Sequence, residues 1–104
     1  DGPSGGIALV TVLISIMTNL KIPKDIAFTG EITLRGNVLA IGGLKEKAIG
    51  AYRNGIKKIV IPFDNRRDLE ELPEEIKNNI TFIPVKNYKD VYKIIKGVEN
   101  EKGN

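Results

Sequence analysis

The sequence of 104 residues contains no cysteine and no histidine. Without cysteine, the chain can form no disulfide, use no thiol nucleophile and bind no metal through sulfur. Without histidine, it lacks the commonest zinc ligand and the side chain that most often acts as a general base near neutral pH. We therefore expect no metal site, and a base in this chain must be lysine, aspartate or glutamate.

The sequence also lacks an apolar run long enough to cross a membrane. Its longest apolar segment, residues 7–20, is interrupted by Thr11, Ser15 and Thr18, and a transmembrane helix needs about 20 predominantly apolar residues. We expect no membrane partner and no signal peptide. A chain that starts at Asp1 is expected to have lost its natural beginning.

Positive charge is in small excess, with a formal net charge of +3. Such an excess permits weak contact with nucleic acid. However, the basic residues alternate with acidic ones, as in RRDLEELPEEIK at residues 66–77, and this mixture is typical of a solvated surface. With 41% hydrophobic and 28% charged residues, the composition is that of one small globular domain.

The first half of the chain predicts a helix, a hairpin and a second helix. The length of residues 7–20 favours a buried helix over a strand. Residues of β type flank the turn signal at 35–37 and predict a β-hairpin over residues 26–41, with Gly30 as a bulge or a point of close approach. Helical spacing then begins at Leu44 and ends at Asn54 and Gly55.

The second half alternates strands and helices. KIVIP at 58–62 predicts an inner parallel strand, and ITFIPV at 80–85 predicts another. Between them we expect a helix from Asp64 to about Leu72 and a short one opened by Pro73. A final helix begins near Tyr88, and residues 99–104 are expected to form a flexible tail. The order predicts an α/β (α+β) fold of hairpin and βαβ units packed with helices.

Ser4 has two interpretations. It stands in DGPSGG just before the predicted helix, where serine is a preferred N-cap, and Thr11, Ser15 and Thr18 would continue its stripe along the helix. At the same place, unpaired backbone N–H groups and the helix dipole would stabilise an oxyanion if Ser4 attacked a carbonyl carbon.

A serine nucleophile needs a base, and in this chain the candidates are lysine, aspartate and glutamate; lysine is the natural choice only if it is neutral. Neutrality near pH 7 requires a pKa about three units below the usual value, which burial away from carboxylates provides. Helical spacing leaves two candidates. Lys45 has the more apolar neighbours, Ile49 and Tyr52, whereas Lys47 lies beside the small Gly50. Each lysine is also explained as a solvated side chain.

A resemblance goes further than the spacing. DGPSGG, followed by TGEITLRGNVLAIGGLKEKAIGAYRNGIKKIVIP, resembles the proteolytic domain of the Lon family of ATP-dependent serine proteases, also called endopeptidase La. The similarity extends over essentially the whole chain. It implies a Ser-Lys dyad in which Ser4 is the nucleophile and Lys47 the base. It further implies that Thr29 orients the lysine, that Asp1 lies near the dyad, and that the backbone of Ser4 and Gly5 holds the oxyanion.

The resemblance also has implications for the longer protein. Residues 1–104 would be the C-terminal part of a proteolytic domain, incomplete at its N-terminus, without the family's ATPase and substrate-binding regions. No Walker A motif is present, so ATP and Mg²⁺ would belong to that separate ATPase region. The family resemblance implies unfolded or regulatory proteins as substrates, a homohexamer, a cytoplasmic location, and allows DNA binding.

Two alternatives belong to other functional classes. One is a non-catalytic Lon-like assembly domain, which would be expected to have lost the serine or the lysine. The other is a module that binds anions or nucleic acid through the Ser4 helix end and the basic excess. Salt-dependent binding to oligonucleotides would favour that module.

Overall fold

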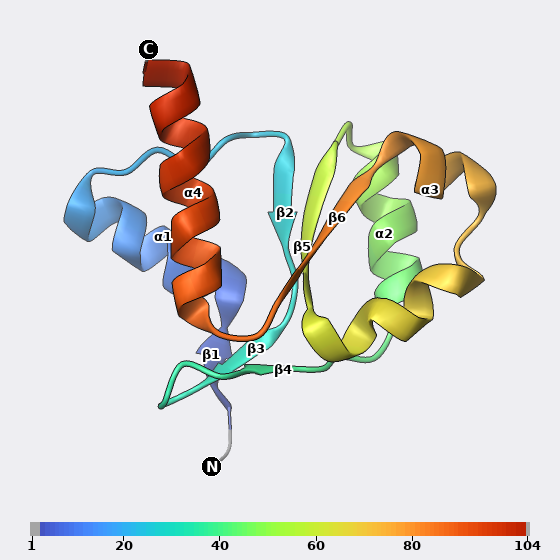
Figure 1. The fold of residues 1–104 in the computed structure, drawn as a ribbon, viewed down its shortest axis with the longest axis horizontal. Coiled ribbons are helices and arrows are strands. Elements are labelled where there is room, and N and C mark those ends of the chain that lie inside the picture. The colour runs from blue at the N-terminus through green and yellow to red at the C-terminus, as the bar shows by residue number, and fades with distance from the viewer. Residues whose placement is uncertain (1–2, 104) are drawn as a thin grey trace.

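The computed structural model describes residues 3–103, and the side chains of residues 6–97. It has an α/β fold in which helices cover both faces of a parallel sheet (Figure 1). In chain order the elements are β1 (Pro3–Gly6), α1 (Ile7–Thr18), β2 (Ile26–Phe28), β3 (Glu31–Thr33), β4 (Val38–Leu39), α2 (Leu44–Arg53), β5 (Lys58–Pro62), the 3₁₀ helix η1 (Phe63–Glu71), α3 (Glu74–Asn79), β6 (Thr81–Val85) and α4 (Tyr88–Gly103).

The parallel sheet has the order β2-β5-β6, so β5 is its central strand. The sequence prediction of an inner parallel strand at residues 58–62 is therefore confirmed. Successive side chains of a strand point to opposite faces. Accordingly, Val60 packs into one hydrophobic core, while Ile59 and Ile61 pack into the other. An apolar side chain on either face is stabilised by burial, at about 1.5–3 kcal/mol for each fully buried residue.

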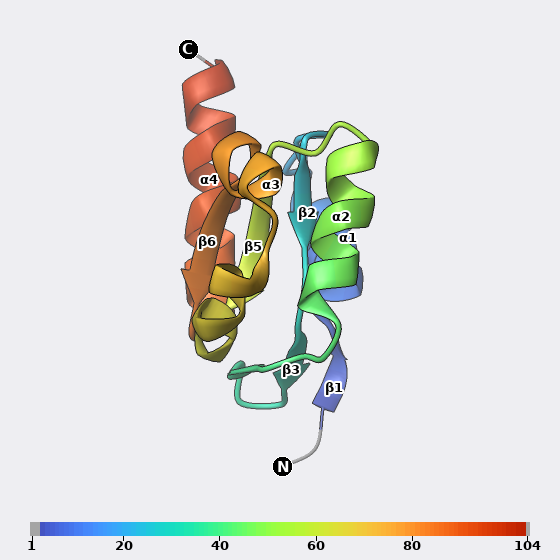
Figure 2. The same cartoon turned by 90° about the vertical axis from the view of Figure 1, so that its right-hand side faces the viewer.

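Figures 1 and 2 show α1 and α4 on one side of the parallel sheet and α2 and α3 on the other. The core under α1 and α4 includes Ile7, Val91 and Ile95. The core under α2 and α3 includes Ala48 and Ile76. This two-sided cover explains why the strand KIVIP is continuously apolar rather than alternating.

The predicted hairpin is confirmed for residues 31–39 only. β3 and β4 pair antiparallel around Gly36, which has a positive φ of 87°. Residues 26–28 were also expected in the hairpin, and that prediction is wrong because they pair with β5 in the parallel sheet. The chain changes sheets at Gly30, whose φ of +117° suits glycine. The predicted close approach at Gly30 is confirmed.

Helix α1 is less buried than its sequence predicts. Ile7 and Thr11 are buried, but several large apolar residues are exposed: Leu9, Val12, Leu13, Ile16 and Met17. The reason is that α1 contacts the rest of the described chain along one stripe, although its sequence is apolar nearly all round. Within the part of the chain that the structure describes, no helix has both the length and the apolar character of a membrane span.

The segment between β5 and β6 differs in type from the prediction. Residues 63–71 form a 3₁₀ helix, and Asp64 lies in its first turn rather than capping it. The short helix α3 begins directly after Pro73, as predicted. The final helix α4 continues through Gly103, so its backbone includes most of the predicted tail, whose flexibility stays a prediction.

Helices α1 and α4 are joined by a hydrogen bond between the hydroxyls of Thr11 and Tyr88, with oxygens 2.9 Å apart. Partial burial raises the pKa of Tyr88 above its ordinary value of 10.0, although the bond with Thr11 opposes part of that rise. A raised pKa in the folded state means that the stability from this group is complete below about pH 10 and is lost as pH rises through the folded-state pKa.

We therefore expect the free energy of unfolding to fall above about pH 10 and to fall less steeply in Tyr88→Phe. Urea denaturation at a series of pH values from about 8 to 11 measures both slopes. An unchanged slope in the variant would contradict a role for Tyr88 in this dependence.

Candidate active site

One cavity brings three separate segments of the chain together. It has a volume of about 480 Å³ and lies between the end of β1, the β2–β3 connection and helix α2. Its lining includes Gly6, Thr29, Gly30, Glu31, Lys47 and Gly50. The predicted base of the dyad, Lys47, and its predicted supporting residue, Thr29, therefore line the same cavity.

Helix α2 carries Lys47 to the cavity. The helix begins after Gly43, whose φ is 71°, and the backbone N–H of Lys47 donates to the Gly43 carbonyl at 3.1 Å. Leu44 and Ala48 are buried against the core and fix which side of α2 faces inward. Gly50 lies one turn after Lys47 on the same side and lines the same cavity, where an added Cβ would meet no atom within 4 Å.

Lys45 lines a different cavity, of about 310 Å³, together with Asp68 and Glu71. The structure therefore separates the two candidate lysines, which helical spacing alone could not. Lys45 and Lys47 are both exposed. The burial expected of Lys45 from its apolar neighbours is not found, because its side chain on the first turn of α2 is exposed. Lys47 does not have the burial expected of a neutral lysine in this structure either.

Thr29 is held firmly at the end of β2. Both its backbone N–H and its hydroxyl donate to the Val60 carbonyl, at 3.0 Å and 2.8 Å. The hydroxyl proton is thus committed to β5, and the lone pairs of Oγ1 are left to accept a hydrogen bond. A bond between Thr29 and the Lys47 amine, which the family resemblance implies, stays a prediction; in this geometry the amine would have to donate it.

Ser4 lies in β1 and not at the helix cap. The residue at the N-cap of α1 is Gly6, and α1 has no side-chain cap. The prediction that Ser4 begins the helix, on one stripe with Thr11, is therefore wrong, because pairing with β3 keeps residues 3–6 extended. The register shifts between Pro3 and Gly5, so Ser4 is the extra residue of a β-bulge. Bulges often occur beside active sites, where they redirect a side chain.

The strand that carries Ser4 is anchored next to the cavity. Gly6 pairs with Glu31 and lines the cavity itself. The N–H of Ile7 donates to the Gly30 carbonyl at 3.0 Å. Figure 2 shows β1 and β3 together at the end of the molecule below α2. The backbone of Ser4 and Gly5 thus belongs to this strand, while the Ser4 side chain and Asp1 lie outside the part of the chain that the structure describes.

Glu31 is a lining residue that sequence reasoning did not single out. Its place two positions after Thr29 was the available signal in the sequence. No ion pair joins Glu31 to Lys47 in the part of the chain that the structure describes. An ion pair with Glu31 would favour the charged form of the lysine. Among the same residues, no three carboxylates gather in a way that could hold a metal ion.

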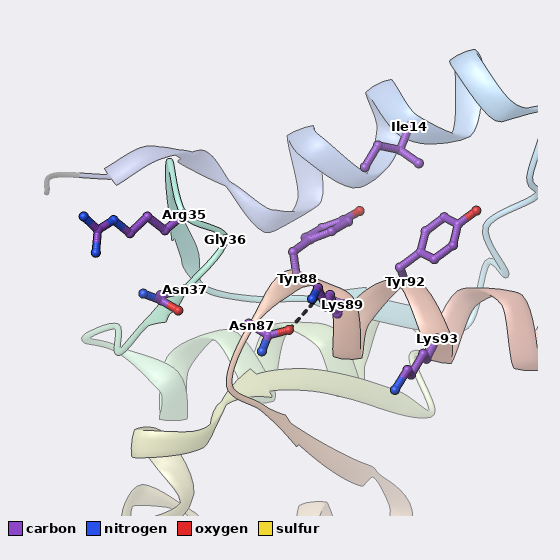
Figure 3. A pocket seen from close by; sticks show the side chains of 9 residues that line it. All are labelled: Ile14, Arg35, Gly36, Asn37, Asn87, Tyr88, Lys89, Tyr92 and Lys93. Atoms are coloured by element: carbon purple, nitrogen blue, oxygen red, sulfur yellow. Dashed lines mark hydrogen bonds between the residues drawn. The ribbon is translucent and has the colours of Figure 1, made fainter.

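A second cavity, of about 490 Å³, lies between α1, the β3–β4 turn and α4. Figure 3 shows the Tyr88 and Tyr92 side chains extending from α4 toward α1, with Arg35 and Lys93 near opposite ends of the cavity. None of the residues predicted for the dyad or its support lines this cavity. The candidate active site is therefore the cavity that Lys47 and Thr29 share.

Comparison with known proteins identifies the family to which this fold belongs. A family model described as the Lon protease (S16) C-terminal proteolytic domain matches residues 1–96. Lon protease of Brucella suis is 55% identical over 93 residues, which are 89% of this chain and 12% of that protein. Lon protease of Fusobacterium nucleatum is 52% identical over 91% of this chain and 12% of its own length.

A mitochondrial Lon protease homolog of Candida dubliniensis is 50% identical over 100% of this chain and 10% of its own length. The chain thus spans about a tenth of the length of the relatives it matches. The family match covers nearly all of the chain, and the mixed α/β fold is consistent with it. The chain belongs to the Lon protease family, and its residues 1–96 match the model of that family's C-terminal proteolytic domain.

Proposed function

We propose that this chain performs peptide-bond hydrolysis with Ser4 as the nucleophile and Lys47 as the general base. The observation that supports this proposal most directly is the shared cavity. Lys47, Thr29 and the end of the strand that carries Ser4 meet there, whereas Lys45 lines another cavity. Membership of a protease family supports the reaction class. The absence of histidine and cysteine supports lysine as the base.

The reaction would proceed by acyl transfer. The neutral Lys47 amine takes the Ser4 hydroxyl proton as Oγ attacks the peptide carbonyl carbon. The oxyanion that forms accepts hydrogen bonds from the backbone N–H groups of Ser4 and Gly5. When the tetrahedral intermediate collapses, the C–N bond breaks and the leaving amine takes the proton from Lys47. Water, activated in the same way, then hydrolyses the Ser4 ester.

Thr29 would orient the lysine. Because its hydroxyl donates to the Val60 carbonyl at 2.8 Å, its oxygen is free to accept an N–H from Nζ of Lys47. A neutral amine held in this way keeps its lone pair for the Ser4 proton. The exposure of Lys47 adds a requirement. A bound peptide, together with residues of the longer protein, must exclude water from the amine to lower its pKa.

In the longer protein we propose a wider role that agrees with the resemblance. This role is the degradation of misfolded and regulatory proteins in the cytoplasm by a homohexamer, with ATP and Mg²⁺ used in a separate region.

The test is covalent labelling by a fluorophosphonate, which reacts with activated serine hydroxyls. The chain offers a matched control because Ser4 and Ser15 are its only serines, and the Ser15 hydroxyl donates to the Leu20 carbonyl. We expect mass spectrometry of the full-length protein to find the label on Ser4 and none on Ser15, and expect Ser4→Ala to abolish labelling of this domain. Undiminished labelling in Ser4→Ala would refute the proposal.

A further inference from the structure

The side chain of Asn65 forms an unusually complete set of hydrogen bonds. It lies in η1 with only 2% of its surface exposed. Its Oδ1 accepts from the backbone N–H of Ile41 at 2.9 Å, and its Nδ2 donates to the Ile41 carbonyl at 2.9 Å. Nδ2 also donates to Oδ2 of Asp68 at 2.7 Å. The amide thus holds both backbone groups of a residue 24 positions earlier.

Ile41 is close to the candidate active site in two respects. It lines the cavity of Lys47 and Thr29, and it begins the turn Ile41-Gly42-Gly43 that leads into α2. A Cβ on either glycine would meet no atom within 4 Å, so this turn is little supported by packing. Two consecutive glycines are also costly to order, because glycine loses the most conformational freedom on folding. Side-chain hydrogen bonds from outside the turn therefore have a large share in fixing it.

The turn is linked directly to the base. The Gly43 carbonyl accepts from the backbone N–H of Lys47 at 3.1 Å, which closes the first turn of α2. A displacement of the turn would therefore move the start of the helix and with it Lys47. From this chain of contacts we propose that Asn65 is a positioning residue, which holds the Ile41–Gly43 turn so that Lys47 stays at the cavity it shares with Thr29. The inference rests on the proposed function of Lys47.

The chemistry of this contact requires an amide. Aspartate has the same shape but only accepts when ionised, so it would lose both donations from Nδ2 and would face the Asp68 carboxylate. Alanine would leave the partly buried N–H and C=O of Ile41 without their partner. Asn65→Asp and Asn65→Ala therefore disturb the same contact in different ways. If both variants lose activity in the same way, the loss cannot be explained by the cavity that alanine leaves or by the charge that aspartate adds.

The matched control is Asn54→Ala. Asn54 lies at the other end of α2, where its exposed side-chain amide donates to the Gly50 carbonyl at 2.9 Å. The substitution removes an asparagine-to-backbone bond from the same helix without touching the Ile41–Gly43 turn. General loss of helix stability would affect this control, whereas loss of positioning at the turn would not.

The experiment measures peptide cleavage by the full-length protein as a function of pH, at a temperature well below the unfolding of each variant. For Asn65→Ala and Asn65→Asp we expect kcat to fall about 10- to 100-fold, with KM changed much less, because a misplaced base weakens a transition-state interaction. We also expect the rising limb of the kcat profile to move to higher pH, because the bound peptide shields a displaced Lys47 amine from water less completely. Asn54→Ala should keep both the rate and the profile.

A second measurement covers the case in which the rates fall through unfolding. Hydrogen exchange in the folded variants should quicken at the Ile41 amide and leave the amides near residue 54 protected. Unchanged kcat in both Asn65 variants, an unmoved pH profile, or an equal loss in Asn54→Ala would each overturn the positioning role. Failure of the proposed function is recognised separately. If Lys47→Met kept full activity, Lys47 would not be the general base, whatever the result for the Asn65 variants.

Discussion

Replacing Lys47 by methionine is expected to lower kcat/KM for casein cleavage by about 100- to 10,000-fold, the usual contribution of a general base. Methionine keeps an unbranched apolar stem of similar length but has no amine, so the Ser4 proton has no acceptor. Lys47→Arg is expected to fail equally, because arginine keeps the positive charge but cannot become neutral in a protein. Together the two variants separate proton transfer from charge.

The control for this prediction is Lys45→Met. Lys45 is also exposed, lies on the first turn of the same helix, and lines a cavity with Asp68 and Glu71 rather than with Thr29. We expect Lys45→Met to keep most of the activity. Ser4→Ala should lose as much as Lys47→Met, while the full-length protein continues to hydrolyse ATP. If Lys45→Met were the inactive variant, the assignment of the base would be wrong.

The parts of the fold that follow from local pattern could be predicted from the sequence. Continuous apolar character placed residues 58–62 inside a parallel sheet, and the turn signal around Gly36 placed the hairpin. The sheet to which residues 26–28 belong could not be predicted, because it depends on pairing with β5, about 30 positions later. Strand pairing over such distances is decided by packing, which the pattern of one segment does not contain.

Less of the candidate site than of the fold could be predicted from the spacing of residues alone. Helical spacing could not choose between Lys45 and Lys47; the choice came from resemblance, and the cavity then separated the two. The position of Ser4 was mistaken because a serine before two glycines looks the same at a helix cap and in a bulged strand. Only the pairing of β1 with β3 distinguishes them.

Asn65 shows a further reason why sequence reasoning stopped short. Asparagine is common in turns and on surfaces, so its position in η1 carries no sign of burial. Its role depends on a contact with Ile41, which the fold creates by bringing η1 beside the start of α2. Residues that act on a site from another element become visible only when the fold is known.

Gly30→Ala is expected to have the largest effect on stability, and its cause is crowding as well as backbone strain. A Cβ at Gly30 would lie 3.0 Å from Cγ of Pro62, 3.1 Å from Cδ1 of Ile7 and 3.3 Å from Cγ1 of Val38. Ile7 and Pro62 are fully buried, so neither can move aside cheaply. The φ of +117° adds strain for any residue with a side chain.

We expect Gly30→Ala to reduce the free energy of unfolding by about 2–6 kcal/mol, from about 1–3 for strain and about 1–3 for overpacking. Urea denaturation measures the change. Two glycines serve as controls. Gly36 has a φ of +87° with no atom within 4 Å of an added Cβ, so Gly36→Ala should show the strain alone. Gly50, helical and also open, should tolerate alanine or be stabilised by it.

The same substitution should also impair the candidate active site. The Gly30 carbonyl accepts the N–H of Ile7, the first residue of α1, and thereby holds the junction between β1 and α1. A Cβ that pushes Ile7 away would displace the strand that carries Ser4 relative to Thr29, which directly precedes Gly30. Fluorophosphonate labelling of the folded fraction should therefore slow in Gly30→Ala but not in Gly36→Ala. Equal labelling rates would mean that the junction tolerates the added methyl group without moving Ser4.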